Sequence, residues 1–222
     1  MPSSTFLCLE KEISKIMLVW TIQPKIVYDS IKKDGYFISN PLFSEYNYMY
    51  YDKHDNSFRR SYDFLISEMN KRVPKPKGYK NIKIPIWSYY KLNGDNKRPD
   101  LRVYGRFIQR KPYVLLELDI PSNELILIDG NEWCYVLNNT PSYFCHSNYE
   151  YDCIDKYYES LREEDKELFK VNSWRKNLFD LNTYDDEVFE EGWEIKHNFI
   201  EAVFWMIKKE YINRVWRYND KL

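Results

Sequence analysis

The chain has 222 residues, of which 44% are hydrophobic and 30% are charged, a balance typical of a folded globular protein rather than a disordered one. Lys and Arg number 33 and Asp and Glu 34, so the net charge of -1 excludes a nucleic-acid clamp that works by bulk positive charge, although a local basic patch stays compatible with it. Aromatic residues make up 18% of the chain, which suits a core opening into a ligand cleft but is also expected from an AT-rich genome.

The sequence also bears on the location of the protein. No apolar run reaches the roughly 20 residues that a membrane span needs, and residues 1–10 lack the basic-then-apolar order of a secretory signal. The four cysteines follow no framework spacing and suit a reducing compartment: Cys8, Cys134, Cys145 and Cys153. We therefore expect a cytoplasmic protein without a membrane partner.

The first predicted element is a strand over residues 16–23, in which both alternating sets of side chains are largely apolar and indicate burial on both faces. Pro24 follows it, and apolar residues then recur at helical spacing until Gly35, which predicts a helix of about eleven residues. Thr21 and Gln23 are the polar residues at the end of the strand. Their position next to a helix N-terminus allows either helix capping or a part in anion binding.

The middle of the chain alternates between helical and strand patterns. Residues 39–58 are rich in Asn, Ser, Asp and Tyr and predict a long loop of the kind that often binds ligands. Strands are expected at residues 82–92, 113–120 and 124–128, with an Asn-Gly turn after the first. Helices are expected at residues 61–72, 131–139, 155–169 and 173–181.

The apolar run at residues 200–207 carries one carboxylate, Glu201. Alternation places Glu201, Val203 and Trp205 on one face of a strand, whereas helical spacing fits the same run equally well. As a strand residue, Glu201 is at least partly buried and needs hydrogen-bond donors or a ligand, while on a helix it faces water. The whole chain, 1–222, is expected to form one α+β domain with a core of about residues 16–217.

Other residues suggest two competing kinds of site. Asp100, Glu117 and Asp119 are similar to the carboxylates that hold Mg²⁺ in metal-dependent nucleases, although Asp119 stands where the restriction-type arrangement has Lys. The aromatic stretch that contains Trp87 and Tyr89 suits a non-catalytic module that stacks on the bases of a nucleic acid. The cysteines lack a close pair, and no metal site is predicted from them.

Several short stretches resemble an uncharacterised bacterial family known only as a domain of unknown function. They include the sequences LVWTIQP, PIW, RPDLR, LLELDIP and EAVFW, and they follow one another in order from residue 18 over nearly the whole chain. The remaining stretches are Glu132-Trp133 with residues 136–138, and Ser173-Trp174 with Leu178-Phe179. The family resemblance itself implies no activity.

A more distant resemblance is to the ADP-ribosyltransferase fold, especially to the branch of DNA-modifying and RNA-modifying bacterial toxins. It is carried by the order of a strand ending in Thr21 and Gln23, a helix ending at Gly35, an aromatic helix, several strands and a late Glu201 followed by Ala-Val. The resemblance implies a split β-sheet core with flanking helices and NAD as cofactor. Thr21 stands where that family usually has His or Arg.

The same resemblance implies roles for individual residues. Glu201 would be catalytic, because a carboxylate that faces the sugar stabilises the oxocarbenium-like transition state formed when the nicotinamide bond breaks. Thr21 and Gln23 would bind the adenine-side ribose or the nicotinamide amide. Tyr62 or Trp87 would stack on the nicotinamide ring, and Arg102 would pair with the pyrophosphate. No metal is needed.

The expected function is therefore that of an NAD-dependent mono-ADP-ribosyltransferase, a glycosyltransferase acting as a bacterial toxin or an antiviral effector. Its target would be a nucleic acid or a protein, and a toxin of this class can also have an antitoxin as a partner. A metal-dependent nuclease and a non-catalytic nucleic-acid-binding module are the alternatives.

Overall fold

The computed structural model describes residues 15–39, 57–79, 84–101, 112–181 and 198–219. The strands are β1 (Ile16–Pro24), β2 (Tyr36–Ile38), β3 (Ile86–Leu92), β4 (Tyr113–Pro121), β5 (Leu125–Asp129), β6 (Phe199–Phe204), β7 (Met206–Lys208) and β8 (Ile212–Tyr218). The helices are α1 (Lys25–Asp34), α3 (Ser57–Arg72), α5 (Gly130–Leu137), α6 (Asn148–Ser160) and α7 (Glu163–Asn177), with the short 3-10 turn η2 (Lys209–Tyr211). The expected α+β class is confirmed.

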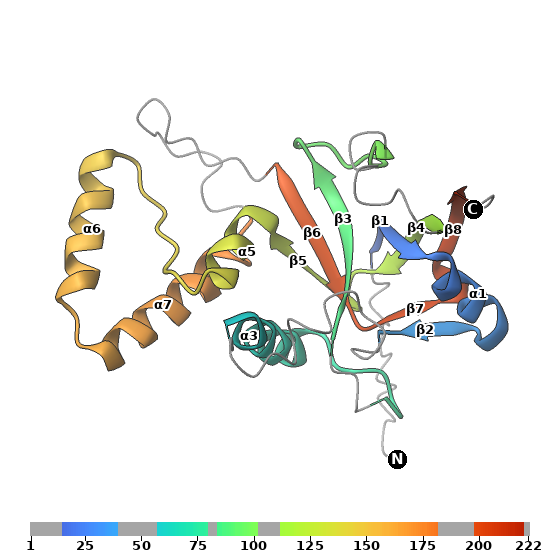
Figure 1. The fold of residues 1–222 in the computed structure, drawn as a ribbon, viewed down its shortest axis with the longest axis horizontal. Helices are drawn as coiled ribbons and strands as arrows, with labels where there is room; N and C mark the ends of the chain where they lie inside the picture. Colours follow the sequence, from blue (N-terminus) through green and yellow to red (C-terminus); the bar gives the residue numbers. More distant parts are fainter. Residues whose placement is uncertain (1–14, 40–56, 80–83, 102–111, 182–197, 220–222) are drawn as a thin grey trace, which may run out of the picture.

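The strands form a six-stranded sheet in the order β5-β6-β3-β1-β4-β8 and a separate pair, β2-β7 (Figure 1). Every strand pairing in the described ranges is antiparallel. In the same ranges no helix has the length and apolar character that crossing a membrane requires.

The six-stranded sheet consists of two halves that meet at one residue pair. Strand β1 pairs with β4 along its whole length, from Ile16 to Pro24, but it pairs with β3 only through Trp20 and Tyr89. The β5-β6-β3 half and the β1-β4-β8 half of the six-stranded sheet are therefore joined by a single residue pair.

The two halves fold over one another. Pro121 ends β4 and Leu125 begins β5, so the connection spans at most about 14 Å of extended backbone. In a flat sheet the order of the strands would put β5 about 19 Å from β4. The short connection is possible because the halves face each other, and one buried cluster accordingly contains Leu118 and Ile120 of β4 together with Phe204 of β6.

A second buried cluster covers the opposite face of the β5-β6-β3 half. It packs Tyr62 and Leu65 of α3 and Trp133 of α5 against Ile128 and Val203 of the strands. Helices α3, α5 and α7 lie on this side of the sheet, as Figure 1 shows.

Local sequence signals fix the ends of α1 and of β3 as expected. Pro24, with φ of -54°, directly precedes α1, and Gly35 ends the helix in the left-handed conformation with φ of 82°. The predicted turn after β3 is also present: Asn93 and Gly94 both have positive φ, and the backbone amides and carbonyls of Leu92 and Asp95 pair with each other.

Other boundaries differ from the sequence prediction. Helix α3 begins at Ser57, within the predicted loop, and residues 40–56 of that loop lie outside the described residues. Strand β1 is buried at Val19, Trp20 and Thr21 only, so the prediction of burial on both faces along most of the strand is wrong. The outer positions of β1 lie at the ends of the sheet and are half-buried or exposed.

The prediction of a single charged helix at residues 155–169 is wrong. The helical conformation is interrupted at Leu161 and Arg162, so the segment belongs to two helices, α6 and α7. Glu163, Glu164 and Asp165 form the first turn of α7, where negative charge stabilises a helix N-terminus. Sequence periodicity missed the break because neither Gly nor Pro marks it.

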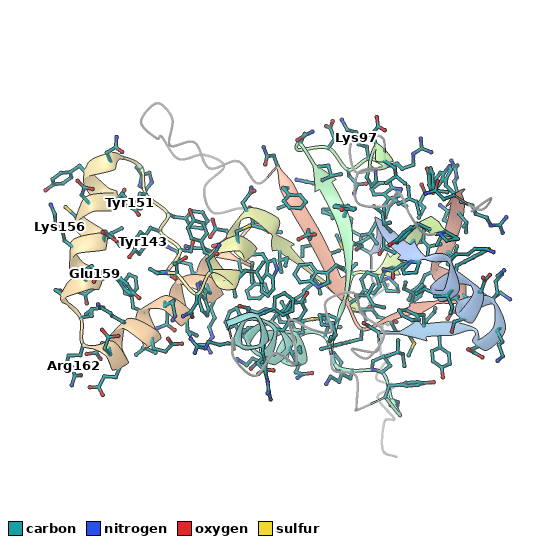
Figure 2. All side chains as sticks on the ribbon, in the orientation of Figure 1. Lys97, Tyr143, Tyr151, Lys156, Glu159 and Arg162 are labelled. Atoms are coloured by element: carbon teal, nitrogen blue, oxygen red, sulfur yellow. The ribbon has the colours of Figure 1, made fainter. Side chains whose placement is uncertain are left out.

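The two helices form a hairpin that projects from the sheet, and the ring of Tyr143 lies between them (Figure 2). The Tyr143 hydroxyl donates to Asp155 Oδ1 at 3.4 Å. Its ring centroid lies 5.5, 6.4 and 6.2 Å from those of Tyr151, Tyr158 and Phe169. No residue of α6 is buried, so aromatic contacts of this kind hold the outer helix in place.

Candidate functional site

Glu201 lies within β6, between Tyr89 of β3 and Ile128 of β5. The structure thus decides the ambiguity at residues 200–207 in favour of strands. Paired residues of an antiparallel sheet project from the same face, and alternation adds Val203 of β6 and Trp87 of β3 to that face. The carboxyl group of Glu201 therefore projects from the face against which Tyr62 of α3 and Trp133 of α5 pack.

The Glu201 side chain is half-buried, and in the described part of the chain it has no hydrogen-bond or ion-pair partner. Burial, and secondarily the negative charge of Asp129, raise its pKa to about 7. Asp129 is itself buried and caps α5, where its Oδ1 accepts from the amides of Asn131 at 2.8 Å and Glu132 at 3.2 Å. Near neutral pH, Glu201 can therefore accept a hydrogen bond, exchange a proton or face a developing positive charge.

Three aromatic rings pack against one another on the same face of the sheet as this carboxylate. The ring centroid of Trp133 lies 5.1 Å from that of Trp87 and 5.6 Å from that of Tyr62. The centroids of Tyr62 and Trp87 are 6.1 Å apart. The buried Nε1 of Trp87 has no acceptor among the described residues, which is unusual for an indole N–H. We refer to Tyr62, Trp87 and Trp133 as the aromatic cluster.

Thr21 and Gln23 lie at the gap between the two halves of the sheet. Thr21 is 1% exposed, and its hydroxyl donates to the carbonyl of Trp87 at 2.8 Å. Gln23 Nε2 donates to the Thr21 hydroxyl at 2.7 Å. The Thr21 bond connects β1 to β3 next to their one backbone pair, Trp20 and Tyr89, and the Gln23 bond, within β1, supports the Thr21 hydroxyl.

The strand geometry also separates Thr21 and Gln23 from Glu201. Trp20 shares a face with its partner Tyr89, and Thr21 follows Trp20, so Thr21 and Gln23 project from the other face of β1. Six site residues were predicted, and the structure brings three of them to one face of the sheet: Glu201, Tyr62 and Trp87. Thr21 lies on the opposite face and reaches this group only through its bond to the Trp87 carbonyl, and Gln23 binds Thr21. Arg102 lies outside the described residues, and its role stays a prediction.

Glu117, one of the carboxylates of the nuclease alternative, has partners within the protein. Glu117 is buried and accepts hydrogen bonds from Trp20 Nε1 and Asn213 Nδ2, each at 3.1 Å. Among the described residues, no three His, Cys, Asp or Glu side chains lie close enough together to hold a metal ion, and this includes Asp100, Glu117 and Asp119.

Sequence reasoning missed several residues around Glu201. The sequence connects Tyr89 only with base stacking and not with Glu201, although the alternation of Trp87 and Tyr89 places both on the Glu201 face. Asp129 could have been found from the Asp-Gly-Asn-Glu sequence, which is typical of a helix N-cap. Phe199 lies two residues before Glu201, with its ring centroid 6.5 Å from that of Tyr89; nothing local in the sequence indicates this contact.

The fold and the site together define an α+β protein with a six-stranded antiparallel sheet and a half-buried carboxylate on the face that carries an aromatic cluster. The chain matches the model of the family described as a domain of unknown function, DUF3841, over residues 18–213, and it belongs to this family. The family expected from the sequence is thereby confirmed. No curated protein and no solved structure matches the chain.

Proposed function

We propose that this protein is an NAD-dependent mono-ADP-ribosyltransferase in which Glu201 is the catalytic carboxylate. The observation that carries this proposal is the position of Glu201: half-buried, without a protein partner in the described residues, and on the same face as the aromatic cluster. Such a carboxylate is costly to keep in a fold unless a ligand uses it.

The chemistry fits this position. Breaking the bond between nicotinamide and ribose leaves positive charge on the sugar, and a fixed carboxylate in a water-poor site stabilises that charge more than it stabilises the ground state. With its pKa near 7, Glu201 is easily protonated when the site is empty, and a cationic sugar beside it would favour the ionised form.

The sheet offers further support, because the ADP-ribosyltransferase resemblance implies a split β-sheet core. Here the two halves meet through Trp20 and Tyr89, and Tyr89 is also the β3 partner of Glu201. Tyr62 or Trp87 would provide the aromatic surface for nicotinamide. Thr21 and Gln23 would act as positioning residues that hold Trp87 through its carbonyl; a direct contact of either with NAD stays a prediction.

The target would be a nucleic acid or a protein, and the biological role that of a toxin or antiviral effector with or without an antitoxin. The test is mass spectrometry of total nucleic acid and total protein after incubation with NAD and the purified protein, with and without a chelator. We expect ADP-ribose to be added to one class of target in both conditions, and no addition with Glu201→Gln. Shortened nucleic acid that disappears with the chelator, without loss of NAD, would contradict the proposal.

A further inference from the structure

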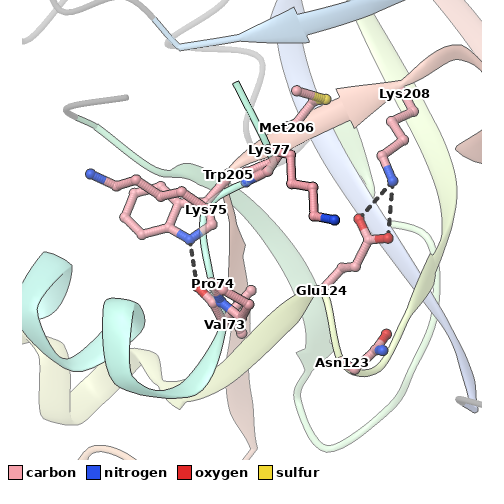
Figure 3. A pocket seen from close by; sticks show the side chains of 10 residues that line it. Val73, Pro74, Lys75, Lys77, Asn123, Glu124, Trp205, Met206 and Lys208 are labelled. Atoms are coloured by element: carbon pink, nitrogen blue, oxygen red, sulfur yellow. Dashed lines mark hydrogen bonds and ion pairs between the residues drawn. The ribbon is translucent and has the colours of Figure 1, made fainter. Parts of the chain in front are cut away.

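The buried neighbours of Glu201 along β6 lie to one side of it. Val203 is fully buried, and Trp205 is 2% exposed and donates from its Nε1 to the carbonyl of Val73 at 2.8 Å. A cavity of about 350 Å³ lies at this tryptophan, by the bend between β6 and β7 (Figure 3), and Glu201 is not among its lining residues. The carboxylate is therefore closed off in the direction of this cavity.

The exposed neighbours of Glu201 lie in the opposite direction. Phe199 precedes Glu201 by two residues on the same face of β6, and Tyr89 lies opposite Glu201 on β3. Both rings are half-buried, and their centroids are 6.5 Å apart. Ile128, the partner of Glu201 on β5, is fully buried. In the described part of the chain, the exposed side of Glu201 is thus the side of Phe199 and Tyr89.

Helix α5 brings Cys134 to this side. The ring of Phe199 packs so closely against Gly130 that it leaves no room for a Cβ there. Cys134 lies one helical turn after Gly130 on the same side of α5, and its thiol donates to the Gly130 carbonyl at 3.7 Å. Cys134 is exposed. We refer to Tyr89, Phe199 and Cys134 as the exposed rim of the Glu201 site.

The electrostatic potential at this rim is negative. Burial, and then the charges of Glu201, Glu132 and Asp129, raise the pKa of the Cys134 thiol, and no positively charged group of the described residues offsets them. Glu201 has the largest effect of the three carboxylates. Since the effect of a charge falls with distance, this agrees with a position of Cys134 close to Glu201.

We infer that the exposed rim binds a flat organic cation, with Tyr89 and Phe199 as the rings beside it and Glu201 as its counter-ion. Aromatic rings and a carboxylate both attract organic cations, whereas an anionic ligand would meet the negative potential at Cys134. The inference rests on the proposed function in that it concerns the same site. Under that function the cation is the nicotinamide ring of NAD, which is positively charged while it is bonded to ribose.

The test compares three small pyridine compounds that differ in charge. 1-Methylnicotinamide is a cation, nicotinamide is neutral and nicotinate is an anion. Calorimetric titration of the purified chain at pH 7.5 to 8, where Glu201 is mostly ionised, should give the affinities in that order, and the affinity for the cation should fall as salt is raised. Equal affinities, tighter binding of nicotinate or failure of the cation to bind would overturn the inference.

A charge placed at the rim tests the position of the ligand. Cys134→Arg adds a positive charge at an exposed residue and should weaken binding of 1-methylnicotinamide at least about tenfold. Cys134→Ser adds no charge and is the matched control, with an affinity close to that of the wild type. Equal affinities of the arginine and serine variants would contradict a cation site at this rim.

The wild-type thiols give a second readout that needs no substitution. Cys134 and Cys153 are both exposed, and Cys153 lies far from the site on α6, so it serves as an internal control. In alkylation by N-ethylmaleimide at about pH 8.5, 1-methylnicotinamide should slow the reaction of Cys134 only. Glu201→Gln should speed the reaction of Cys134 and not that of Cys153, because loss of the negative charge lowers the thiol pKa. Equal protection of both thiols, or protection of neither, would contradict the inference.

These outcomes separate the inference from the proposed function. Binding of the cation without release of nicotinamide from NAD would support the inference and contradict the transferase. Release of nicotinamide from NAD that is unchanged in Cys134→Arg would support the transferase and contradict the inference.

Discussion

Glu201 and Tyr89 lie directly opposite each other on β6 and β3, and Tyr89 is also the residue through which β3 pairs with β1. The carboxylate is therefore one strand away from the junction of the two halves of the sheet. Any ligand that enters between Glu201 and the aromatic cluster lies beside this junction, where the hydroxyl of Thr21 holds the Trp87 carbonyl.

The bond between Thr21 and Trp87 predicts a measurable cost when the hydroxyl is lost. Thr21→Val has nearly the same shape but leaves the Trp87 carbonyl and the Gln23 amide without their partner, so the free energy of unfolding should fall by about 1–3 kcal/mol. Thr21→Ser keeps the hydroxyl and is the matched control. Urea denaturation at pH 7 measures both, and a valine variant as stable as the serine variant would show that this bond does not hold the strands together.

The raised pKa of Glu201 predicts a pH-dependent stability. Its pKa is about 7 in the folded chain and about 4.5 when unfolded, so the folded state binds more protons between these values and loses stability as pH rises through them. Glu201→Gln removes this loss. When the pH is raised from 4.5 to 8, the unfolding free energy of Glu201→Gln should therefore increase relative to that of the wild type by about 1–3 kcal/mol.

Denaturant titrations at several pH values measure this difference, with Glu210→Gln on the exposed η2 turn as the control. A Glu201→Gln variant whose stability follows that of the wild type at every pH would mean that the carboxyl group is not buried as described.

Glu68 predicts the opposite pH dependence. It is 3% exposed, and although burial opposes its ionisation, hydrogen bonds from Lys71, Arg72 and Arg175 lower its pKa from 4.5 to about 2. Glu68→Gln should therefore cost about 2–3 kcal/mol at pH 7, and the cost should vanish as pH falls from 4.5 toward 2. Chemical denaturation at pH 7 and pH 3 tests this, and a cost that does not shrink at low pH would rule out charge as its origin.

Gly130 predicts a steric coupling next to the site. A Cβ at this position would lie 2.4 Å from the ring of Phe199, so Gly130→Ala forces the ring to move and should destabilise the fold by about 1–3 kcal/mol. Combining it with Phe199→Ala should give less than the sum of the two single costs, because the clash is gone. Additive costs in a double-mutant cycle would argue against this contact.

The elements that the sequence predicts correctly are those with local signals at their ends. Pro24 and Gly35 bound α1, and the Asn-Gly step at Asn93 turns the chain after β3. The tail was ambiguous because strand and helix patterns fit the same apolar run. Only the pairing of Glu201 with Tyr89 and Ile128, far away in the sequence, decides between them.

The folding-over of the two halves could not be predicted either, since it follows from strand order and not from any local pattern. For the same reason, the sequence predicted one site containing Glu201, Thr21 and Gln23. It could not show that Thr21 and Gln23 project from the face of the sheet opposite to Glu201. The charge of Asp129, which contributes to the raised pKa of Glu201, is likewise a long-range effect.

The most direct test of the central claim is the release of nicotinamide from NAD by the purified chain at pH 7.5 to 8, where Glu201 is mostly ionised. Wild type and Glu210→Gln should release nicotinamide at the same rate, while Glu201→Gln, still folded, should lose at least about 99% of it, as expected when a charge that stabilises the transition state is removed. Equal release by Glu201→Gln and wild type, or no release by the wild type with any nucleic-acid or protein target, would contradict the assignment.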